Sequence, residues 1–316
     1  MVQSSPHLRN QESTQSIMLK VIIALVPAGI ASVIIFGLRS LLVIGVCVAS
    51  CVLFEYLYRR LLKKGNTISD LSAVVTGLLL AYNLPVDFPI WMTIIGCFCA
   101  IVIIKQLFGG IGQNFVNPAI AARVILLVAF VQPMTTWAIP QMVDGSIVTV
   151  AGATPLAFLN QGNLAEMPSY LDMFLGIRGG SLGETCIAAL LLGGVFLCVT
   201  KVIKPTIPLI FMGTVALLSW ILGSDPLYHL LAGGVVLGAI FMATDYTTSP
   251  ATTLGQVIFA IGCGVLTVII RLYGSYPEGV SFSILLMNLV VPLIDRKFKT
   301  KPVGTLQTTK TGGAAN

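Results

Sequence analysis

Residues 17–37 read IMLKVIIALVPAGIASVIIFG, an apolar run interrupted by a single charge at Lys20. A hydrocarbon core about 30 Å thick is crossed by roughly 20 residues of helix, so a run of this length predicts a transmembrane helix. Similar apolar runs recur at 40–58, 68–84, 89–104, 119–131, 183–200, 206–223, 227–243, 254–270 and 280–294. The sequence therefore predicts about ten membrane spans, several of them short.

The composition of the whole chain agrees with this prediction. Of its 316 residues, 56% are hydrophobic and only 9% are charged, whereas a typical soluble domain is about 25% charged. The mean hydropathy is +0.95. A soluble protein of this size could not cover its surface with so few charges. The composition excludes a nucleic-acid-binding module, a disordered scaffold and a disulfide-rich secreted domain.

The lysines and arginines predict the orientation, because cytoplasmic loops of membrane proteins carry an excess of them. With a cytoplasmic N-terminus, only three of the 18 lysines and arginines fall outside, namely Arg39, Arg178 and Arg271. An even number of spans then places both termini in the cytoplasm. The predicted divisions are a cytoplasmic tail at 1–16, a five-helix repeat at 17–131, an extracytoplasmic loop at 132–182, a second five-helix repeat at 183–294 and a basic cytoplasmic tail at 295–316.

The two predicted five-helix units resemble each other along the sequence. The tripeptides at 81–83 and 243–245 each end a glycine-containing span, and the dipeptides at 108–109 and 273–274 each precede a polar break. A duplicated unit with an odd number of spans must lie inverted relative to its twin, as in many transporters. The alternative is that any two stretches of membrane helix look alike.

A threonine in the predicted external loop stands in a recognisable context. Residues 150–159 read VAGATPLAFL, in which Thr154 suits a helix N-cap and Pro155 the first helical position. A helix start of this kind favours a phosphate, because its free N–H groups carry partial positive charge. Taken alone, this is a common capping pattern.

The run GATPLA at 152–157 and the run GIGQNFVNPA at 110–119 carry a more specific signal. Together with the span pattern, they resemble the family that comprises RnfD of the Rnf electron-transport complex and NqrB of the Na⁺-pumping NADH:quinone oxidoreductase. The short segment before the first span favours the Rnf type. The resemblance implies an all-α membrane protein with about ten transmembrane helices in two inverted five-helix repeats. An extracytoplasmic, flavin-bearing loop would lie between the repeats.

The resemblance also implies cofactors and partners. Thr154 matches the position that carries covalent FMN through a phosphoester bond, with Gly152, Ala153 and Pro155 beside it and the hydroxyl exposed outside the membrane. The partners implied are RnfA, RnfB, RnfC, RnfE and RnfG, together with a flavin transferase. The complex would relay electrons between ferredoxin and NAD⁺, coupled to translocation of Na⁺ or H⁺.

Two asparagines precede the fifth apolar run. In the resembling family, an Asn-x-x-Asn-Pro segment is associated with non-covalent riboflavin, and Asn114, Asn117 and Pro118 match it. The alternative is that Asn114 and Asn117 only cap the helix that begins near Pro118. Both interpretations stay open at this point.

Ionisable groups within or beside spans are candidates for an ion path, because their burial in lipid is costly. Glu55, Asp70 and Asp245 are the candidates, although Glu55 is expected to pair with Arg59 four residues later. Asp70 is placed to complement a helix dipole at the start of the third run. Arg123 requires an acid, a carbonyl or a flavin oxygen as its partner.

The seven cysteines all lie in apolar runs and are expected to be small packing residues rather than metal or cluster ligands. The leading functional prediction is therefore a redox subunit that is not catalytically self-sufficient. A secondary transporter or channel without flavin, and the quinone-reductase type of subunit, are the alternatives.

Overall fold

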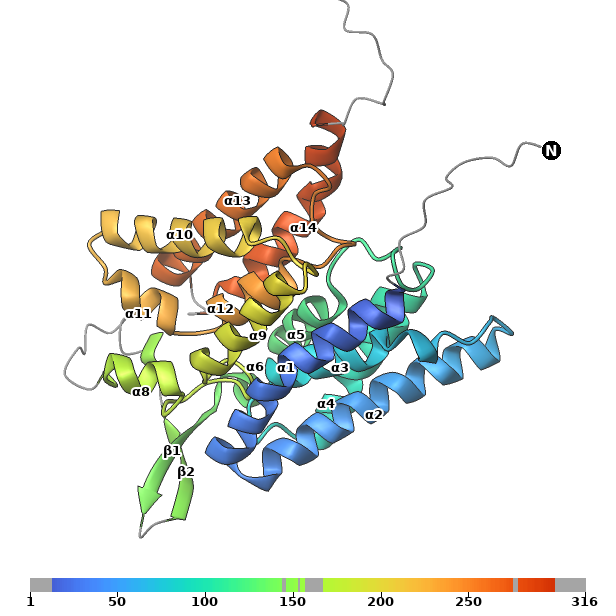
Figure 1. The fold of residues 1–316 in the computed structure, drawn as a ribbon. Helices are drawn as coiled ribbons and strands as arrows, with labels where there is room; N and C mark the ends of the chain where they lie inside the picture. Colours follow the sequence, from blue (N-terminus) through green and yellow to red (C-terminus); the bar gives the residue numbers. More distant parts are fainter. Residues whose placement is uncertain (1–12, 144–145, 153, 157–166, 275–277, 299–316) are drawn as a thin grey trace, which may run out of the picture.

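The computed structural model describes residues 13–143, 146–152, 154–156, 167–274 and 278–298. In this part of the chain the protein is mostly helical, with a single two-stranded sheet (Figure 1). Three of the described helices are long and apolar enough to cross a membrane, namely α1 (Thr14–Phe36), α2 (Leu38–Leu61) and α13 (Thr253–Tyr273). The prediction of a helical membrane protein is confirmed at this level.

The other helical elements lie within or across the remaining apolar runs and the polar stretch between them. In chain order they are η1 (Ile68–Asp70), α3 (Ser72–Tyr82), α4 (Ile90–Phe98), η2 (Cys99–Gln106), α5 (Pro118–Ala129), α6 (Val131–Thr135), α8 (Tyr170–Leu175), α9 (Ile187–Val199), α10 (Thr206–Ile221), α11 (Pro226–Leu231), α12 (Val235–Leu237), η4 (Gly238–Met242) and α14 (Val280–Lys297). The eighth apolar run is divided among α11, α12 and η4. Both η2 and η4 are π-helical. Helices of this type are rare in proteins, and those that occur are often found at functional sites.

Local sequence explains where the first two helices begin and end. The Ser13 hydroxyl accepts a hydrogen bond from the N–H of Ser16 and caps α1. Gly37 separates α1 from α2 with a φ of 76°, in the left-handed region that other residues rarely adopt. The break lets two long apolar helices pack on each other instead of continuing as one rod.

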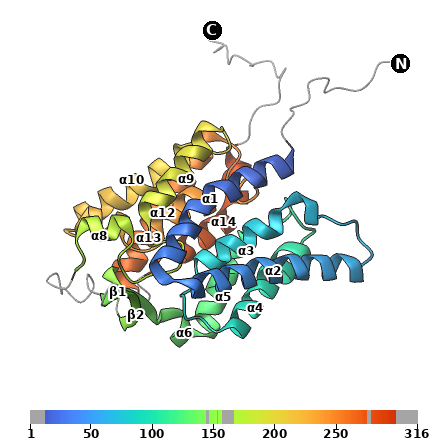
Figure 2. The same cartoon turned by 60° about the horizontal axis from the view of Figure 1, so that its bottom comes forward.

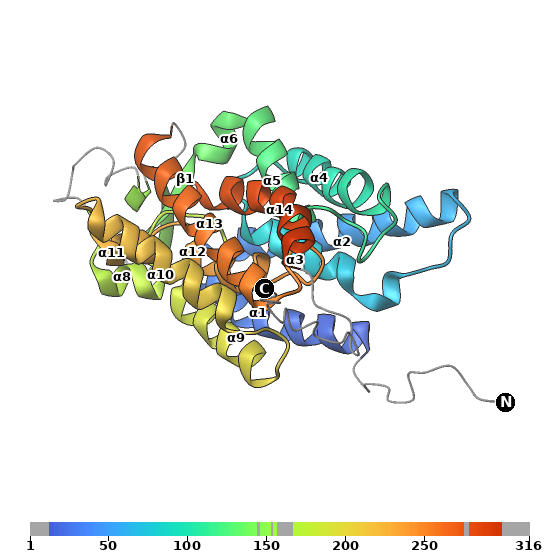
Figure 3. The same ribbon diagram turned by 90° about the horizontal axis from the view of Figure 1, so that it is seen from above.

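The helices pack in two groups that meet along α1. Helix α1 contacts α2 and α3 on one side and α9 on the other (Figures 2 and 3). In the second group α10 packs on α13, and α13 packs on α14. Helices α5 and α14 also contact each other, so the two groups are joined at a second place.

Large apolar side chains cover the outside of these groups. Leu38 is 78% exposed, Val199 is 74% exposed and Trp220 is 68% exposed. Monomeric soluble proteins rarely expose contiguous apolar surface of this kind. The exposed apolar side chains on α1, α2, α9 and α10 are suited to contact with lipid.

A β-hairpin interrupts the helical architecture, although the sequence patterns did not lead us to expect one. Strands β1 (Trp137–Val143) and β2 (Ser146–Gly152) pair antiparallel, with Trp137 opposite Gly152. The hairpin lies on the side of the molecule away from the start of α1 and the end of α14 (Figure 1). The sequence between the strands, Asp144-Gly145, is a typical hairpin signal.

Candidate functional site

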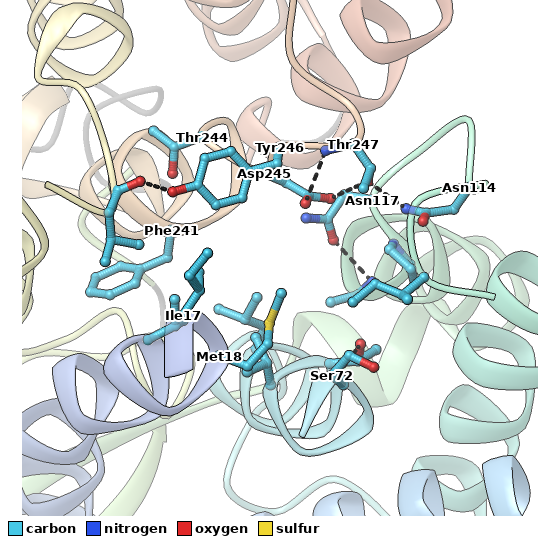
Figure 4. Close-up of a pocket in the computed structure, with 18 of the residues that line it drawn as sticks. Ile17, Met18, Ser72, Asn114, Asn117, Phe241, Thr244, Asp245, Tyr246 and Thr247 are labelled. Atoms are coloured by element: carbon cyan, nitrogen blue, oxygen red, sulfur yellow. Dashed lines mark hydrogen bonds between the residues drawn. The ribbon is translucent and has the colours of Figure 1, made fainter. Parts of the chain in front are cut away.

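A pocket of about 290 Å³ lies where the ends of several helices meet. Its lining comes from the starts of α1, α3 and α5, the ends of η2 and α9, and η4 with the segment that follows it. Ile17 and Met18 lie on one side of it, opposite Asn117, Asp245 and Thr247 (Figure 4). We call this region the asparagine pocket. Both π-helices contribute to its wall.

Asn117 caps α5 and also lines the asparagine pocket. Its side-chain oxygen accepts from the N–H groups of Ala119 and Ile120, at 3.1 and 3.3 Å, and so caps α5. Its side-chain nitrogen donates to the carbonyl of Met242, at 3.4 Å, and the residue lines the pocket. The capping interpretation is confirmed for Asn117.

Asn114 does not cap a described helix. Its amide nitrogen donates to the carbonyl of Val116 and to the hydroxyl of Thr247, each at 3.1 Å. The Thr247 hydroxyl also donates to Asp245 at 3.1 Å, and Thr248 donates to the same carboxylate at 3.2 Å. Asn114 and Asp245, which lie in different predicted repeats, are therefore linked through one hydroxyl at the pocket wall.

Glu55 and Asp70 belong to one chain of polar groups that reaches the same pocket. Lys105 Nζ lies 2.8 Å from Glu55 Oε2 and 2.6 Å from Ser72 Oγ. Asp70 Oδ1 accepts from the hydroxyl of Ser72 at 2.5 Å and from its N–H at 2.8 Å. Ser72 is the first residue of α3, so the position expected for Asp70 is confirmed. Lys105 and Ser72 line the asparagine pocket.

The expected pairing of Glu55 with Arg59 is wrong. Glu55 is 1% exposed and is bound by Lys105 and by the hydroxyl of Thr67, at 2.6 Å. Arg59 instead donates to the carbonyl of Gly65 at 2.7 Å, in the loop beyond α2. The two side chains face different surroundings, because Glu55 points into the packed side of α2 while Arg59 lies near its end. Helical spacing could not reveal a partner from another span.

Thr154 lies far from this pocket in the chain, directly after β2. Its side chain is 5% exposed, whereas the sequence predicted an exposed hydroxyl. Leu156, two residues later, is buried in a small apolar cluster with Met173 and Ala232. This cluster holds the segment against α8 and the end of α11.

The residues around Thr154 follow the predicted pattern in part. Gly152 ends β2, and Pro155 and Leu156 are helical, as a cap at Thr154 predicts. Ala153 and residues 157–166 lie outside the described residues.

Three arginines that are distant in sequence converge on the buried interior near this segment. Arg123, Arg178 and Arg271 are each no more than 3% exposed. Glu184 interacts electrostatically with all three, and Glu278 forms an ion pair with Arg123. We call these five side chains the arginine cluster. Among the described residues it contains three cations and two anions.

Hydrogen bonds fix two of these arginines in place. Arg178 donates to the backbone carbonyls of Glu184 and Thr185, at 2.8 and 3.4 Å. Arg123 donates to the hydroxyl of Ser281 at 2.6 Å, in addition to its ion pair. Among the partners that the sequence left open for Arg123, the acid is therefore correct.

Arg271 connects the cluster to the threonine segment. It donates to the carbonyl of Ala232 at 2.9 Å. A Cβ atom placed on Gly233 would lie 2.8 Å from Arg271 Nη2 and 2.9 Å from Leu156 Cδ1. The guanidinium group is thus next to Leu156, two residues after Thr154.

Lys105, Glu184 and Arg271 were not among the site residues predicted from the sequence. All three border apolar runs, and the principle that ionisable groups beside a span are functional candidates applied to them as well. The sequence contains no signal for which of these charges meet, since the contacts join different helices.

Comparisons with known proteins identify the family of this chain. Residues 1–304 match the model of the NQR2, RnfD, RnfE family. The chain is 50% identical over 311 residues to the D subunit of the Na(+)-translocating ferredoxin:NAD(+) oxidoreductase complex of Acetobacterium woodii, covering 98% of this chain and 96% of that one. It is 45% identical over 317 residues to the D subunit of the proton-translocating ferredoxin:NAD(+) oxidoreductase complex of Clostridium ljungdahlii, covering 96% and 95%.

A more distant relative also matches over nearly the whole length of both chains. The D subunit of the ion-translocating oxidoreductase complex of Escherichia coli O81 is 37% identical over 342 residues, covering 95% of this chain and 97% of that one. Since both the family model and these relatives match along nearly the whole length, the chain belongs to the NQR2, RnfD, RnfE family, and its similarity to the D subunits supports the RnfD type within it.

Proposed function

We propose that this chain is the RnfD membrane subunit of an Rnf-type complex, which relays electrons between ferredoxin and NAD⁺ and couples their transfer to the movement of Na⁺ or H⁺. The observation that carries the proposal is the 50% identity, over 98% of the chain, to a relative named as this subunit. The other subunits of such a complex are the proposed partners. The chain contributes to the enzyme as one component.

The electron carrier in this proposal is FMN joined to Thr154 by a phosphoester bond, attached by a flavin transferase outside the membrane. The residues present fit such a group, because Thr154 supplies an alcohol and the buried arginine cluster beside Leu156 supplies positive charge. When bound, the flavin supplies the redox chemistry. Thr154 acts as a tether, and its burial excludes water from the attachment point.

A second, non-covalent flavin such as riboflavin is proposed for the asparagine pocket. Ligand pockets commonly measure about 300–1,000 Å³ and are mostly apolar with a few polar groups, and this pocket of about 290 Å³ is of that kind. Asn114 offers an amide at the wall, and Ile17 and Met18 offer an apolar face. These side chains would bind the edge and the plane of a flavin ring.

We also propose the inverted repeat, which the packing of the helices supports. Helix α2 packs on α3 and α4, as α10 packs on η4 and α13. Helix α5 packs on α3 and α4, as α14 packs on η4 and α13. In this proposal, residues 17–131 superpose on 183–294 after rotation about an axis in the membrane plane. The asparagine pocket then lies toward the cytoplasmic side, with both termini.

The ion path in this proposal runs past the asparagine pocket. Asp245 lies at its wall, and the chain of Glu55, Lys105, Ser72 and Asp70 reaches it from another side. These groups can exchange a proton or contact a cation through hydrogen-bonded neighbours. Two of the relatives carry names that specify different ions, Na⁺ in one and the proton in the other.

The central test is the state of Thr154 in the complex produced together with a flavin transferase. We expect mass spectrometry of the peptide that contains Thr154 to show the added mass of FMN. Flavin fluorescence should persist on the denatured chain in a gel, and Thr154→Ala should abolish it. Thr154→Ser, which keeps a hydroxyl, is the matched variant and should retain some fluorescence.

Two results would overturn the flavin assignment. One is an unmodified Thr154 in an electron-transferring complex, and the other is fluorescence retained at another residue in Thr154→Ala. In either case Thr154 would be only a helix cap, and the electron carrier would lie elsewhere.

A further inference from the structure

A second cavity, of about 450 Å³, lies beside the asparagine pocket and shares part of its wall. Thr244, Tyr246 and Thr247 border both cavities (Figure 4). The rest of the lining comes from the connection between α9 and α10 with the start of α10, the segment before α13 with its first turn, and the end of α14. We call this cavity the lysine pocket, because Lys201 and Lys204 line it.

The two lysines define the charge of a suitable ligand. Lys201 and Lys204 are both exposed, and neither forms an ion pair with another described residue. The one acidic side chain among the described residues of the lining, Asp295, accepts a hydrogen bond from the N–H of Ala251 at 3.1 Å. Since both cations lack an acidic partner in this part of the chain, a ligand of the lysine pocket is expected to be an anion.

Gln256 adds a second requirement. Its side-chain nitrogen donates to the carbonyl of Pro250 at 3.2 Å, but its side-chain oxygen is buried and has no hydrogen-bond partner among the described residues. An amide oxygen only accepts hydrogen bonds, and leaving a buried acceptor unpaired is unfavourable. The ligand should therefore also bring a donor such as a hydroxyl group. A phosphate ester with a hydroxyl-bearing headgroup meets both requirements.

The surroundings of the lysine pocket indicate a lipid rather than a soluble phosphate ester. Each of the three helices that line it carries an exposed leucine two residues away from a lining residue, namely Leu209 on α10, Leu254 on α13 and Leu293 on α14. Such side chains are suited to acyl chains, while lysines at the ends of spans reach the headgroups. The predicted orientation places this end of the helices in the cytoplasm, where the anionic lipids of the leaflet attract lysines.

We propose that the lysine pocket binds an anionic phospholipid of the phosphatidylglycerol type. Lys201 and Lys204 pair with the phosphate, and a hydroxyl of the glycerol headgroup donates to the side-chain oxygen of Gln256. The acyl chains extend along the exposed leucines of the neighbouring helices. The lipid thereby covers the cavity next to the asparagine pocket. The inference does not depend on a flavin at either of its proposed sites.

The test measures binding of phosphatidylglycerol to the full chain, purified in detergent and freed of lipid. Native mass spectrometry reports the fraction of the chain that retains lipid at each lipid concentration. Phosphatidylglycerol should bind more tightly than phosphatidylcholine, which has no net charge and no donor. Lys201→Gln combined with Lys204→Gln should weaken its binding about 30-fold, since each lysine near an anionic membrane surface contributes roughly fivefold.

Two exposed lysines beyond the end of α2 provide the matched control. Lys63 and Lys64 lie on the same predicted side of the membrane and outside the lysine pocket. Lys63 and Lys201 also share a left-handed backbone, with φ values of 52° and 56°. Lys63→Gln combined with Lys64→Gln removes the same charge and should leave the affinity for phosphatidylglycerol unchanged.

A substitution of Gln256 tests the hydroxyl contact. Phosphatidic acid carries the phosphate but lacks the glycerol headgroup, so the unsubstituted chain should prefer phosphatidylglycerol to it. Gln256→Leu removes the buried acceptor and should abolish this preference. A preference that is the same in Gln256→Leu and the unsubstituted chain would contradict the assigned contact.

Three results would overturn the lipid site. One is equal affinity for phosphatidylglycerol and phosphatidylcholine, which is also the result expected if an acidic protein surface occupies the pocket. Another is the same loss of affinity in the control pair as in the pair Lys201 and Lys204. The third is displacement of the lipid by an equal concentration of glycerol 3-phosphate, which would indicate a site for a soluble phosphate ester. If the glutamine variants do not fold, Lys201→Arg combined with Lys204→Arg keeps both charges, and retained or lost binding decides for or against the site.

Discussion

The asparagine pocket and the arginine cluster lie toward opposite ends of α9 and bury charge in opposite ways. Near the pocket, Lys105 and Glu55 neutralise each other at 2.8 Å, and both are almost fully buried. The arginine cluster instead gathers three arginines and two glutamates from distant parts of the chain, and Glu184 Oε2 has no hydrogen-bond partner among the described residues. The first arrangement is a direct ion pair between two helices, whereas the second spreads its charges over several elements.

The largest expected effect on stability comes from removing one partner of the ion pair between Lys105 and Glu55. Lys105→Met should leave the Glu55 carboxylate buried without its cation, at a cost of roughly 3–5 kcal/mol in the free energy of unfolding. The measurement is denaturation of the purified chain in detergent, monitored through the loss of its helical signal.

Replacement of both partners is the control for this pair. The double variant Glu55→Gln with Lys105→Met should recover most of the loss, since no charge is then left unpaired. A single variant as stable as the unsubstituted chain would show that the pair is not maintained in the membrane protein.

A smaller effect is expected from the packed layer between the two regions, where α1 crosses α9. A Cβ atom on Gly193 would collide with the carbonyl oxygen of Ala24 and lie 3.0 Å from the ring of Phe241. Gly193→Ala should destabilise the chain by about 1–3 kcal/mol, because a backbone carbonyl cannot move aside.

Gly213 provides a matched control within α10, since a Cβ atom there would meet nothing within 4 Å. Gly213→Ala should leave stability unchanged or raise it by up to about 1 kcal/mol, through better helix propensity. Equal losses in the two variants, measured by the same denaturation, would show that the close approach of α1 and α9 is absent.

The smallest expected change in stability concerns the two asparagines of the asparagine pocket. Asn117→Ala removes the cap of α5 and should cost about 1 kcal/mol, whereas Asn114→Ala should cost less, because Asn114 caps no described helix. Both variants should also lower the amount of non-covalently bound flavin that is released when the protein is denatured. Asn117→Asp, which retains an acceptor for the cap, should restore stability; a loss equal to that of Asn117→Ala would contradict the capping role.

Predictability from sequence differed between the elements of the fold. Helices lie within the apolar runs, although the run at 227–243 is divided among three short elements. The length of a hydrophobic segment is a local property that needs no partner. The cap at Asn117 and the acid at Asp70 were also readable, since they bond to residues two or three positions away. The hairpin at 137–152 carried a turn signal at Asp144-Gly145 between two largely apolar segments, but these segments are only seven residues long and were not distinguished from the predicted external loop.

The pairing of charges was not readable in the same way. The expected partner of Glu55 was the residue one helical turn away, but the partner in the structure is Lys105, on a different helix. Arg123 finds Glu278 across almost half of the chain. Sequence spacing describes neighbours on one helix, whereas a buried charge selects its partner among all the helices that pack around it.

The amino-acid sequence by itself determined that this protein is helical, lies in a membrane and presents a threonine in a family-specific context, because each property depends on a short contiguous segment. Only the tertiary structure decided that Thr154 is buried, that Leu156 lies against Arg271, and that Arg123 and Arg178 share Glu184 with it. The physical reason is that electrostatic interactions between buried groups act through space, and the distances are set by how the helices pack.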